Sequence, residues 1–201
     1  MIISFLKLLE KRQEGKLDEE SKKYIYFVID GANRLKLLIE DLLKYSRVGN
    51  NTDEFTKTKL SGLGQYINLV LKEKIDSNNA SIVIKPMPMI YVNTTLINTL
   101  FVNLVENALK YHGEQTPIIE IGCNEDEHTN TFYVKDNGIG ISAEYFEKIF
   151  IIFKRLHGKA QYKGTGVGLA LCKKIIEIHN GKIWVESEEG RGSTFFFSIP
   201  K

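Results

Sequence analysis

The sequence predicts an α+β protein, in which an α-helical hairpin is followed by a two-layer sandwich of a mixed β-sheet with helices on one face. Two observations lead to this fold class. Apolar residues in the N-terminal part recur at alternating spacings of three and four, which is the pattern of packed helices. The rest of the chain alternates helical runs with short strand-like segments that are bounded by turn residues.

The N-terminal part has a heptad pattern. Between residues 24 and 46 the apolar or small positions are Ile25, Val28, Ala32, Leu35, Ile39, Leu42 and Ser46. Residues 1–13 repeat the spacing and are separated from the longer helix by a polar turn at 14–16. We therefore expect residues 1–48 to form a hairpin whose short first arm leaves an apolar stripe. A second chain would cover this stripe in a dimeric four-helix bundle, and a monomer with the helix folded back is the alternative.

Residues 49–58 are polar and without periodicity, so they are predicted to be a linker to a second domain at 59–201. Helices are predicted at 60–76, 95–111, 143–149 and 166–179. Strands are predicted at 81–85, 90–92, 118–124, 131–136, 182–187 and 193–199.

Composition limits the partners and the compartment. With 27 Lys and Arg against 25 Asp and Glu, the net charge of +2 gives no electrostatic reason to expect nucleic acid or an acidic membrane as the main partner. Cys123 and Cys172 lie far apart in apolar stretches, which favours buried reduced thiols and a cytoplasmic compartment over a disulfide or metal site. No apolar run approaches the roughly 20 residues that span a bilayer, so any membrane tether is expected outside these residues.

Three polar residues share one face of the helix predicted at 95–111. Asn103, Asn107 and Lys110 stand at i, i+4 and i+7. Neutral amide oxygens can ligate Mg²⁺ without cancelling its charge, and an ammonium group can meet phosphate oxygens. The face therefore suits a metal-bound triphosphate, with an ordinary solvated helix face as the alternative.

Asp136 begins a glycine turn, D-N-G-I-G-I, directly after a strand-like segment. A carboxylate at the edge of a sheet can accept a hydrogen bond from an exocyclic amino group. Gly138 and Gly140 let a flat ring approach the backbone up to Ile141. The turn suits adenine, although a plain turn has the same composition.

A second glycine-rich segment, K-G-T-G-V-G-L, opens the helix predicted at 166–179. Free N–H groups and the positive end of the helix dipole would face a ligand in this loop, and phosphate is the natural one. The spacing of the glycines, and the polar segment before them, do not match the dinucleotide-binding fingerprint. The residues expected to line this loop are Lys163, Gly164, Thr165, Gly166, Val167, Gly168 and Leu169.

The segment before this loop has the composition of a mobile lid. Its cationic and polar residues are Lys154, Arg155, His157, Lys159 and Lys163. Arg155 is the best candidate for the γ-phosphate because its fork of donors matches phosphate geometry, and a solvated basic loop is the alternative. At 189–195, E-G-R-G-S-T-F indicates a hairpin turn whose Ser193 and Thr194 could add hydroxyl contacts near the base.

In this order and at these separations, the motifs resemble the nucleotide-binding boxes of the sensor histidine kinase catalytic domain, which has the GHKL or Bergerat ATP-binding fold. N-L-V-E-N-A-L-K-Y is similar to the N box, D-N-G-I-G-I to the G1 box, F-E-K-I-F-I-I-F-K-R-L-H to the F box and G-T-G-V-G-L to the G2 box. The helix ending in L-L-K-Y-S-R-V is similar to the dimerisation and phosphotransfer hairpin of the same family, so the resemblance covers residues 1–201.

The resemblance implies ATP and Mg²⁺ as cofactors, a homodimer, and a response-regulator receiver domain as partner. It assigns Mg²⁺ to Asn107 with help from Asn103, the phosphate and ribose side to Lys110 and Tyr111, adenine to Asp136 and the γ-phosphate to Arg155. The implied catalytic residues are Asn103, Asn107, Lys110 and Arg155. Phe150 and Phe153 are spaced like the F-box pair and are expected to pack the lid as a hinge.

Glu106 bears on the choice between phosphoryl transfer and hydrolysis. Hydrolysing members of the wider superfamily, such as type II topoisomerases, place a Glu four residues before the metal-binding Asn, where it activates water. Here that position is Asn103, and Glu106, one residue before Asn107, points roughly 100° away around the helix. Transfer is therefore predicted, with a hydrolysing ATPase and a nucleotide-binding adaptor as the rival functions.

The phosphoaccepting histidine of the family stands early in the first hairpin helix, and this chain has none there. His112, His128, His157 and His179 all lie in the predicted catalytic domain. We therefore expect no autophosphorylation at the usual site. A fragment that begins after the histidine is favoured over a natural protein that has lost it.

Overall fold

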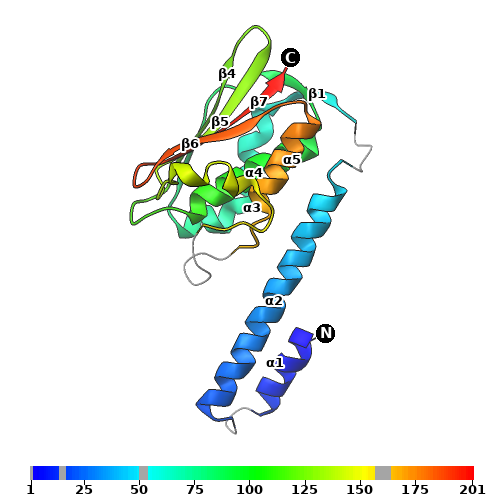
Figure 1. Cartoon of the computed structure of the whole chain (residues 1–201), viewed down its shortest axis with the longest axis vertical. Coiled ribbons are helices and arrows are strands. Elements are labelled where there is room, and N and C mark those ends of the chain that lie inside the picture. The colour runs from blue at the N-terminus through cyan, green and yellow to red at the C-terminus, as the bar shows by residue number, and fades with distance from the viewer. Residues whose placement is uncertain (1, 14–16, 50–53, 157–163) are drawn as a thin grey trace. The chain divides into compact units, whose positions relative to one another are not determined.

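The computed structural model describes residues 2–13, 17–49, 54–156 and 164–201. The chain divides into two compact units, Met1–Lys44 and Tyr45–Lys201. Figure 1 shows the elements of each unit. The predicted helical hairpin corresponds to the first unit, and the predicted α+β domain lies in the second.

The first unit consists of α1 (Ile2–Arg12) and most of α2 (Glu19–Arg47). Asp18 caps α2, because its Oδ1 accepts a hydrogen bond from the N–H of Ser21 at 2.7 Å. Among the described side chains of α2, only Ile25 is buried. Three of the heptad positions, Leu35, Ile39 and Leu42, are 59%, 51% and 46% exposed, so the predicted apolar stripe faces water in the isolated chain.

The second unit contains a mixed sheet with three α-helices on one face (Figure 1). Its helices are α3 (Leu63–Ser77), α4 (Thr94–Lys110) and α5 (Gly168–Ile178), with 3-10 helices η1 (Leu60–Gly62), η2 (Ala143–Tyr145) and η3 (Lys148–Phe150). Its strands are β1 (Thr56–Lys59), β2 (Ser81–Ile84), β3 (Met89–Val92), β4 (Ile118–Glu125), β5 (Thr129–Asp136), β6 (Ile183–Glu188) and β7 (Gly192–Pro200).

The main sheet has five strands in the order β2-β4-β5-β7-β6. The β2 and β4 pair is parallel, and the other neighbours are antiparallel. Strands β1 and β3 form a separate antiparallel pair. The predicted two-layer α+β architecture is therefore confirmed, and the carboxyl end of the central strand β5 is at Asp136.

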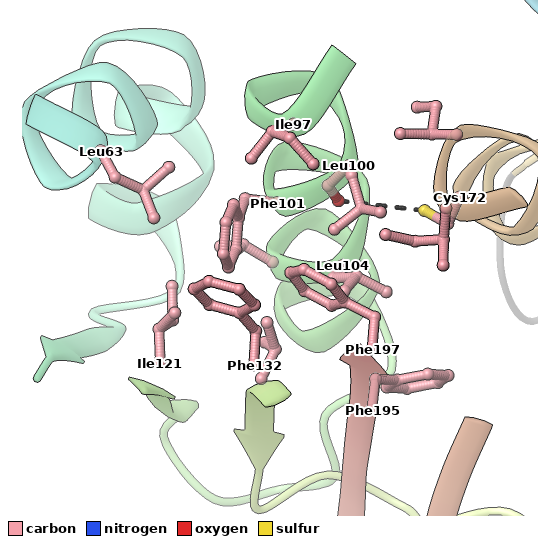
Figure 2. Packing of buried hydrophobic residues seen from close by; sticks show 14 of the residues in the cluster. Leu63, Ile97, Leu100, Phe101, Leu104, Ile121, Phe132, Cys172, Phe195 and Phe197 are labelled. Atoms are coloured by element: carbon pink, nitrogen blue, oxygen red, sulfur yellow. Dashed lines mark hydrogen bonds between the residues drawn. The ribbon is translucent and has the colours of Figure 1, made fainter. Parts of the chain in front are cut away.

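The core lies between the sheet and the helices because buried residues alternate along the strands and recur along one face of α4. Figure 2 shows Phe101 of α4 above Phe132 of β5 and Phe197 of β7. Phe132 and Phe197 stack with ring centroids 5.0 Å apart, and Phe101 meets both rings edge-on. Cys172 on α5 points at the Leu100 carbonyl of α4, with its Sγ 3.9 Å from that oxygen (Figure 2), so α5 packs against α4.

Two predicted elements are corrected by the structure. The helix predicted at 143–149 is replaced by η2 and η3, since only Ile149 is buried there and short 3-10 turns suffice as connectors. The predicted linker at 49–58 includes the first residues of β1, which pairs with β3 from Thr56 opposite Val92. The polar sequence T-K-T-K of β1 carries no apolar alternation, so its strand conformation depends on its partner.

The last turn of α2 belongs to the second unit and packs on α5. The Nζ of Lys174 donates to the Tyr45 carbonyl at 2.9 Å and lies 4.5 Å from the centre of the Tyr45 ring. Val48 is buried. Both cysteines are free, as predicted, but Cys123 is only half-buried. In the described part of the chain, no helix combines the length and apolarity needed to cross a membrane.

Candidate functional site

The site is built on the face of α4 that carries Asn103, Asn107 and Lys110. Asn93 caps this helix, since its Oδ1 accepts from the N–H of Leu96 at 3.0 Å. The Nδ2 of Asn103 donates to the Thr99 carbonyl at 2.8 Å, which leaves the Oδ1 as the outward amide atom. All three functional side chains are half-buried. They are therefore held at a protected surface and still open to a ligand.

The glycine-rich loop at 164–168 runs along this face of α4. A Cβ placed on Gly164 would lie 2.6 Å from the Nζ of Lys110, and one on Gly168 would lie 3.0 Å from the Oδ1 of Asn103. Because Asn107 stands between these two residues on the same helix face, it faces the middle of the loop. The predicted convergence of the two motifs is therefore observed.

The loop leads directly into the N-terminus of α5. The helix begins at Gly168, and Val167 at its N-cap makes no side-chain capping bond. The first N–H groups of a helix have no partners within it, and the helix dipole adds positive potential there, so this end of α5 suits an anion. Thr165 and Gly166 precede the helix start, Leu169 packs against the core, and Val167 is buried.

Asp136 stands at the carboxyl end of β5, where the sheet meets the loop that follows α4. Its Oδ1 accepts from the N–H of Gly138 at 2.8 Å and from the N–H of Ser193 at 3.1 Å. Burial raises the pKa of this carboxyl above its ordinary value, and the two backbone donors oppose that rise. Since both bonds end on Oδ1, the second oxygen remains as an acceptor for a ligand amino group.

The glycine turn after Asp136 is tied to the end of α4. The N–H of Ile139 donates to the Tyr111 carbonyl at 3.0 Å, and a Cβ on Gly138 would lie 2.5 Å from the same oxygen. The Nζ of Lys110 donates to the Tyr111 hydroxyl at 2.8 Å. The turn, Tyr111 and Lys110 therefore form one connected side of the site.

The turn between β6 and β7 closes the other side, through a residue that the sequence did not single out. The Oγ of Ser187 accepts from the N–H of Ile141 and donates to the Gly192 carbonyl, both at 2.8 Å. Ser193 is buried beside it, with the two hydroxyl oxygens 3.0 Å apart. A serine on a strand gives no sequence signal of such a role.

Thr194, also predicted near the base, lies on the opposite face of β7 from Ser193. Along β7, Ser193 and Phe195 are buried, and Thr194 between them is half-buried. Successive side chains of a strand point to opposite faces of the sheet, so Thr194 lies on the outer face with Phe196.

The predicted lid lies only partly within the described residues. His157, Lys159 and Lys163 fall outside them. Where the chain is described, the N–H of Phe153 donates to the Gly166 carbonyl at 2.9 Å, which ties the two ends of the segment together. Arg155, the γ-phosphate candidate, is half-buried just beyond this bond. Phe150 packs against the core, whereas Phe153 is 52% exposed, so only Phe150 of these two rings shows the expected packing.

Glu106 points away from this site, as predicted. Its carboxylate pairs with Lys74 on α3. Asn103 occupies the position of the water-activating Glu of hydrolysing relatives, and its amide has no basicity for that role. Among the described residues, the face of α4 that meets the loop therefore carries no carboxylate.

These groups come together around one region. The structure brings together the face of α4, the Asp136 turn, the start of α5 and Ser193. The predicted residues in this arrangement are Asn103, Asn107, Lys110, Tyr111, Asp136, Gly138, Gly140, Ile141, Gly164, Thr165, Gly166, Val167, Gly168, Leu169 and Ser193. The fold and this arrangement define an ATP-binding domain of the GHKL type.

Comparisons with known proteins agree. Residues 93–201 match the family described as histidine kinase-, DNA gyrase B-, and HSP90-like ATPase. The phytochrome-like protein Cph1 of Synechocystis sp. is 41% identical over 199 residues, which are 99% of this chain and 27% of Cph1. The solved catalytic domain of the histidine kinase ThkA is 34% identical, with a TM-score of 0.63, over 74% of this chain and 96% of that one. ThkA in complex with the response regulator protein TrrA is 28% identical, with a TM-score of 0.69, over 100% of this chain and 57% of that one.

The chain therefore belongs to the histidine kinase-, DNA gyrase B- and HSP90-like ATPase family, and within it resembles the catalytic domains of histidine kinases. ATP is the nucleotide of this family. The chain spans about a quarter of the length of the curated relatives that it matches.

Proposed function

We propose that this chain is the ATP-binding catalytic core of a sensor histidine kinase. It holds Mg²⁺-ATP and directs the γ-phosphoryl group to a histidine outside the residues given, for relay to a response-regulator aspartate. The observation that carries the proposal is the shared face of α4 and the 164–168 loop, where Asn103 and Lys110 lie against Gly168 and Gly164.

Mg²⁺ fits the donor set on α4. The Nδ2 of Asn103 is engaged by Thr99, so its Oδ1 and the amide oxygen of Asn107 are the neutral oxygen ligands on offer. Bound there, Mg²⁺ would offset the charge of the triphosphate. The chain's own part is to seat phosphate oxygens at the start of α5 and at Lys110, and adenine at Asp136.

The transfer step needs little covalent chemistry from the protein. A ring nitrogen of the acceptor histidine forms the new N–P bond while the bond from the γ-phosphorus to the ADP oxygen breaks, and ADP leaves with that electron pair. Arg155 is assigned to the developing charge on the γ-phosphoryl oxygens. The pairing of Glu106 with Lys74 supports transfer over hydrolysis, since it leaves no base beside the phosphates in the described site.

We also propose that the helical unit makes a homodimer. Its longer helix, α2, exposes Leu35, Ile39 and Leu42 at heptad spacing, and such an apolar stripe favours association with another apolar face in water. Light scattering on the purified chain should give twice the monomer mass. A monomer mass at micromolar concentration would contradict this part of the proposal.

The test of function uses two steps. Calorimetry on the full chain should show Mg²⁺-ATP binding, and the Asp136→Asn variant should lose most of it. The chain is then mixed with a longer version of the protein that carries the upstream helix and Asp136→Asn, so that only the short chain can supply ATP. Acid-labile label on a histidine of the longer chain supports the kinase.

Two outcomes would favour the rival functions. Sustained phosphate release by the chain alone, abolished by Asp136→Asn, would indicate a hydrolysing ATPase. Tight ATP binding with no labelled histidine on either chain would indicate a nucleotide-binding adaptor.

A further inference from the structure

Ser187 on β6 occupies the centre of a hydrogen-bond network that joins the two loops around Asp136. Its hydroxyl donates to the Gly192 carbonyl and accepts from the N–H of Ile141, both at 2.8 Å. The hydroxyl of Ser193 lies 3.0 Å away. Because Ser187 gives its only proton to Gly192, the Ser193 hydroxyl is the donor of the third contact. The hydrogen-bonding capacity of Ser187 is then filled within the protein.

One peptide unit connects this network to Asp136. The carbonyl of Gly192 and the N–H of Ser193 are the two ends of the same planar peptide group. The carbonyl end is held by Ser187, and the N–H end donates to the Oδ1 of Asp136 at 3.1 Å. Fixing the carbonyl therefore fixes the direction in which the N–H points.

This peptide begins β7, where Gly192 and Ser193 pair with Glu188 and Ser187 of β6, and the Ser187 hydroxyl adds a side-chain constraint to that pairing. Gly192 has a φ of +98°, and a Cβ there would lie 2.1 Å from the backbone carbonyl of Asp136. The turn is thus pressed against the strand end that carries the carboxylate. The glycine turn after Asp136 is held on the opposite side, because the N–H of Ile141 at its end donates to the Ser187 hydroxyl. This turn carries the Gly138 N–H, which is the second donor to the Oδ1 of Asp136.

We propose that Ser187 is a positioning residue that sets the preference of this site for adenine over guanine, an inference that rests on the proposed function. Two directed N–H groups hold one oxygen of Asp136, so the other oxygen presents a fixed acceptor. Adenine offers an amino donor to such an acceptor, whereas guanine offers a carbonyl in the corresponding place and is repelled. Without the Ser187 hydroxyl, the Gly192–Ser193 peptide keeps its strand pairing but loses one constraint on its orientation, so the carboxylate is held less firmly.

The test measures selectivity rather than affinity alone. Dissociation constants for Mg²⁺-ATP and Mg²⁺-GTP are determined on the full chain for wild type, Ser187→Ala, Ser187→Thr and the control Ser198→Ala. Ser198 is matched because its hydroxyl also bonds across this strand pair at its far end, accepting at 3.0 Å from the N–H of Lys182, the residue before β6. We expect Ser187→Ala to lower the ratio of ATP to GTP affinity by about five- to tenfold, the worth of one hydrogen bond. Ser187→Thr, which keeps the hydroxyl, and Ser198→Ala should keep the wild-type ratio.

Each other outcome overturns the inference. A wild-type ratio in Ser187→Ala, or equal weakening of both nucleotides, shows that Ser187 only stabilises the fold. If Ser187→Ala does not fold, Ser187→Cys carries the same test, since a thiol is similar in size and a much weaker hydrogen-bonding group. A wild-type chain that binds neither nucleotide, or both equally, refutes the proposed site itself and this inference with it.

Discussion

Replacing Asp136 with Asn exchanges a charged acceptor for an amide at the same place. In the structure, Oδ1 already accepts from the N–H groups of Gly138 and Ser193, at 2.8 and 3.1 Å. If the amide oxygen keeps these two bonds, the amide NH₂ group faces the adenine amino group, and two donors meet. The variant therefore loses a hydrogen bond to a charged group, worth about 1.5–3 kcal/mol, or roughly 10- to 150-fold in the dissociation constant.

The fold should tolerate this change, which separates binding from stability. Burial raises the pKa of Asp136, so the charged form costs folding free energy and a neutral amide removes that cost. We expect an unchanged or slightly higher melting temperature alongside the weaker ATP binding seen in calorimetry. In the wild type, affinity should also fall as pH drops through the raised pKa, and Asp136→Asn should lack this fall. Wild-type affinity in a folded variant would refute the assignment of adenine to Asp136.

Three further predictions concern the metal, a glycine and a histidine. Asn107→Asp puts an extra negative charge beside the triphosphate and should slow phosphoryl transfer at least tenfold while changing ATP affinity less. Phosphohistidine yield measures the transfer, and calorimetry measures the affinity. Transfer at the wild-type rate would contradict the metal role of Asn107. Gly140→Ala should lower the free energy of unfolding by about 3 kcal/mol in urea titration, because the φ of Gly140 is +72° and an added Cβ would lie 2.1 Å from the carbonyl oxygen of Glu188 on β6. Gly62→Ala is the control, since a Cβ there would meet open space and should change the free energy of unfolding little. Burial lowers the pKa of His179, and its neutral ring accepts a hydrogen bond from a backbone N–H. The contribution of His179 to the free energy of unfolding should therefore be full above the unfolded pKa of 6.5 and be lost as the pH falls below it. A His179→Leu variant whose melting temperature depends on pH as in the wild type would contradict this.

The parts of the site that follow from local periodicity were predictable from the sequence. Asn103, Asn107 and Lys110 share a face because a helix repeats every 3.6 residues, and Asp136 ends a strand because a glycine turn follows it. The start of α5 at Gly168 was predicted to within two residues, as the glycine-rich loop indicates.

Contacts between distant segments were not predictable in this way. The role of Ser187 depends on the side-by-side arrangement of Ile141 and Gly192, which only the folded sheet creates. The outward direction of Thr194 depends on where β7 starts, and one residue of offset reverses the face. Strand β1 is polar and acquires its conformation from β3, so its own residues give no signal.

The backbone hydrogen bond between Phe153 and Gly166 bears on how the length of the chain between these two residues can vary. It closes a loop whose described residues also touch the domain, since Leu156 packs against the core and Gly164 lies against Lys110. The entropy of closing such a loop grows slowly, by about 0.6 kcal/mol for each doubling of its length. A longer chain between Leu156 and Gly164 should therefore leave the start of α5 in register at a small cost in folding free energy, as long as Arg155 and Gly164 themselves are kept.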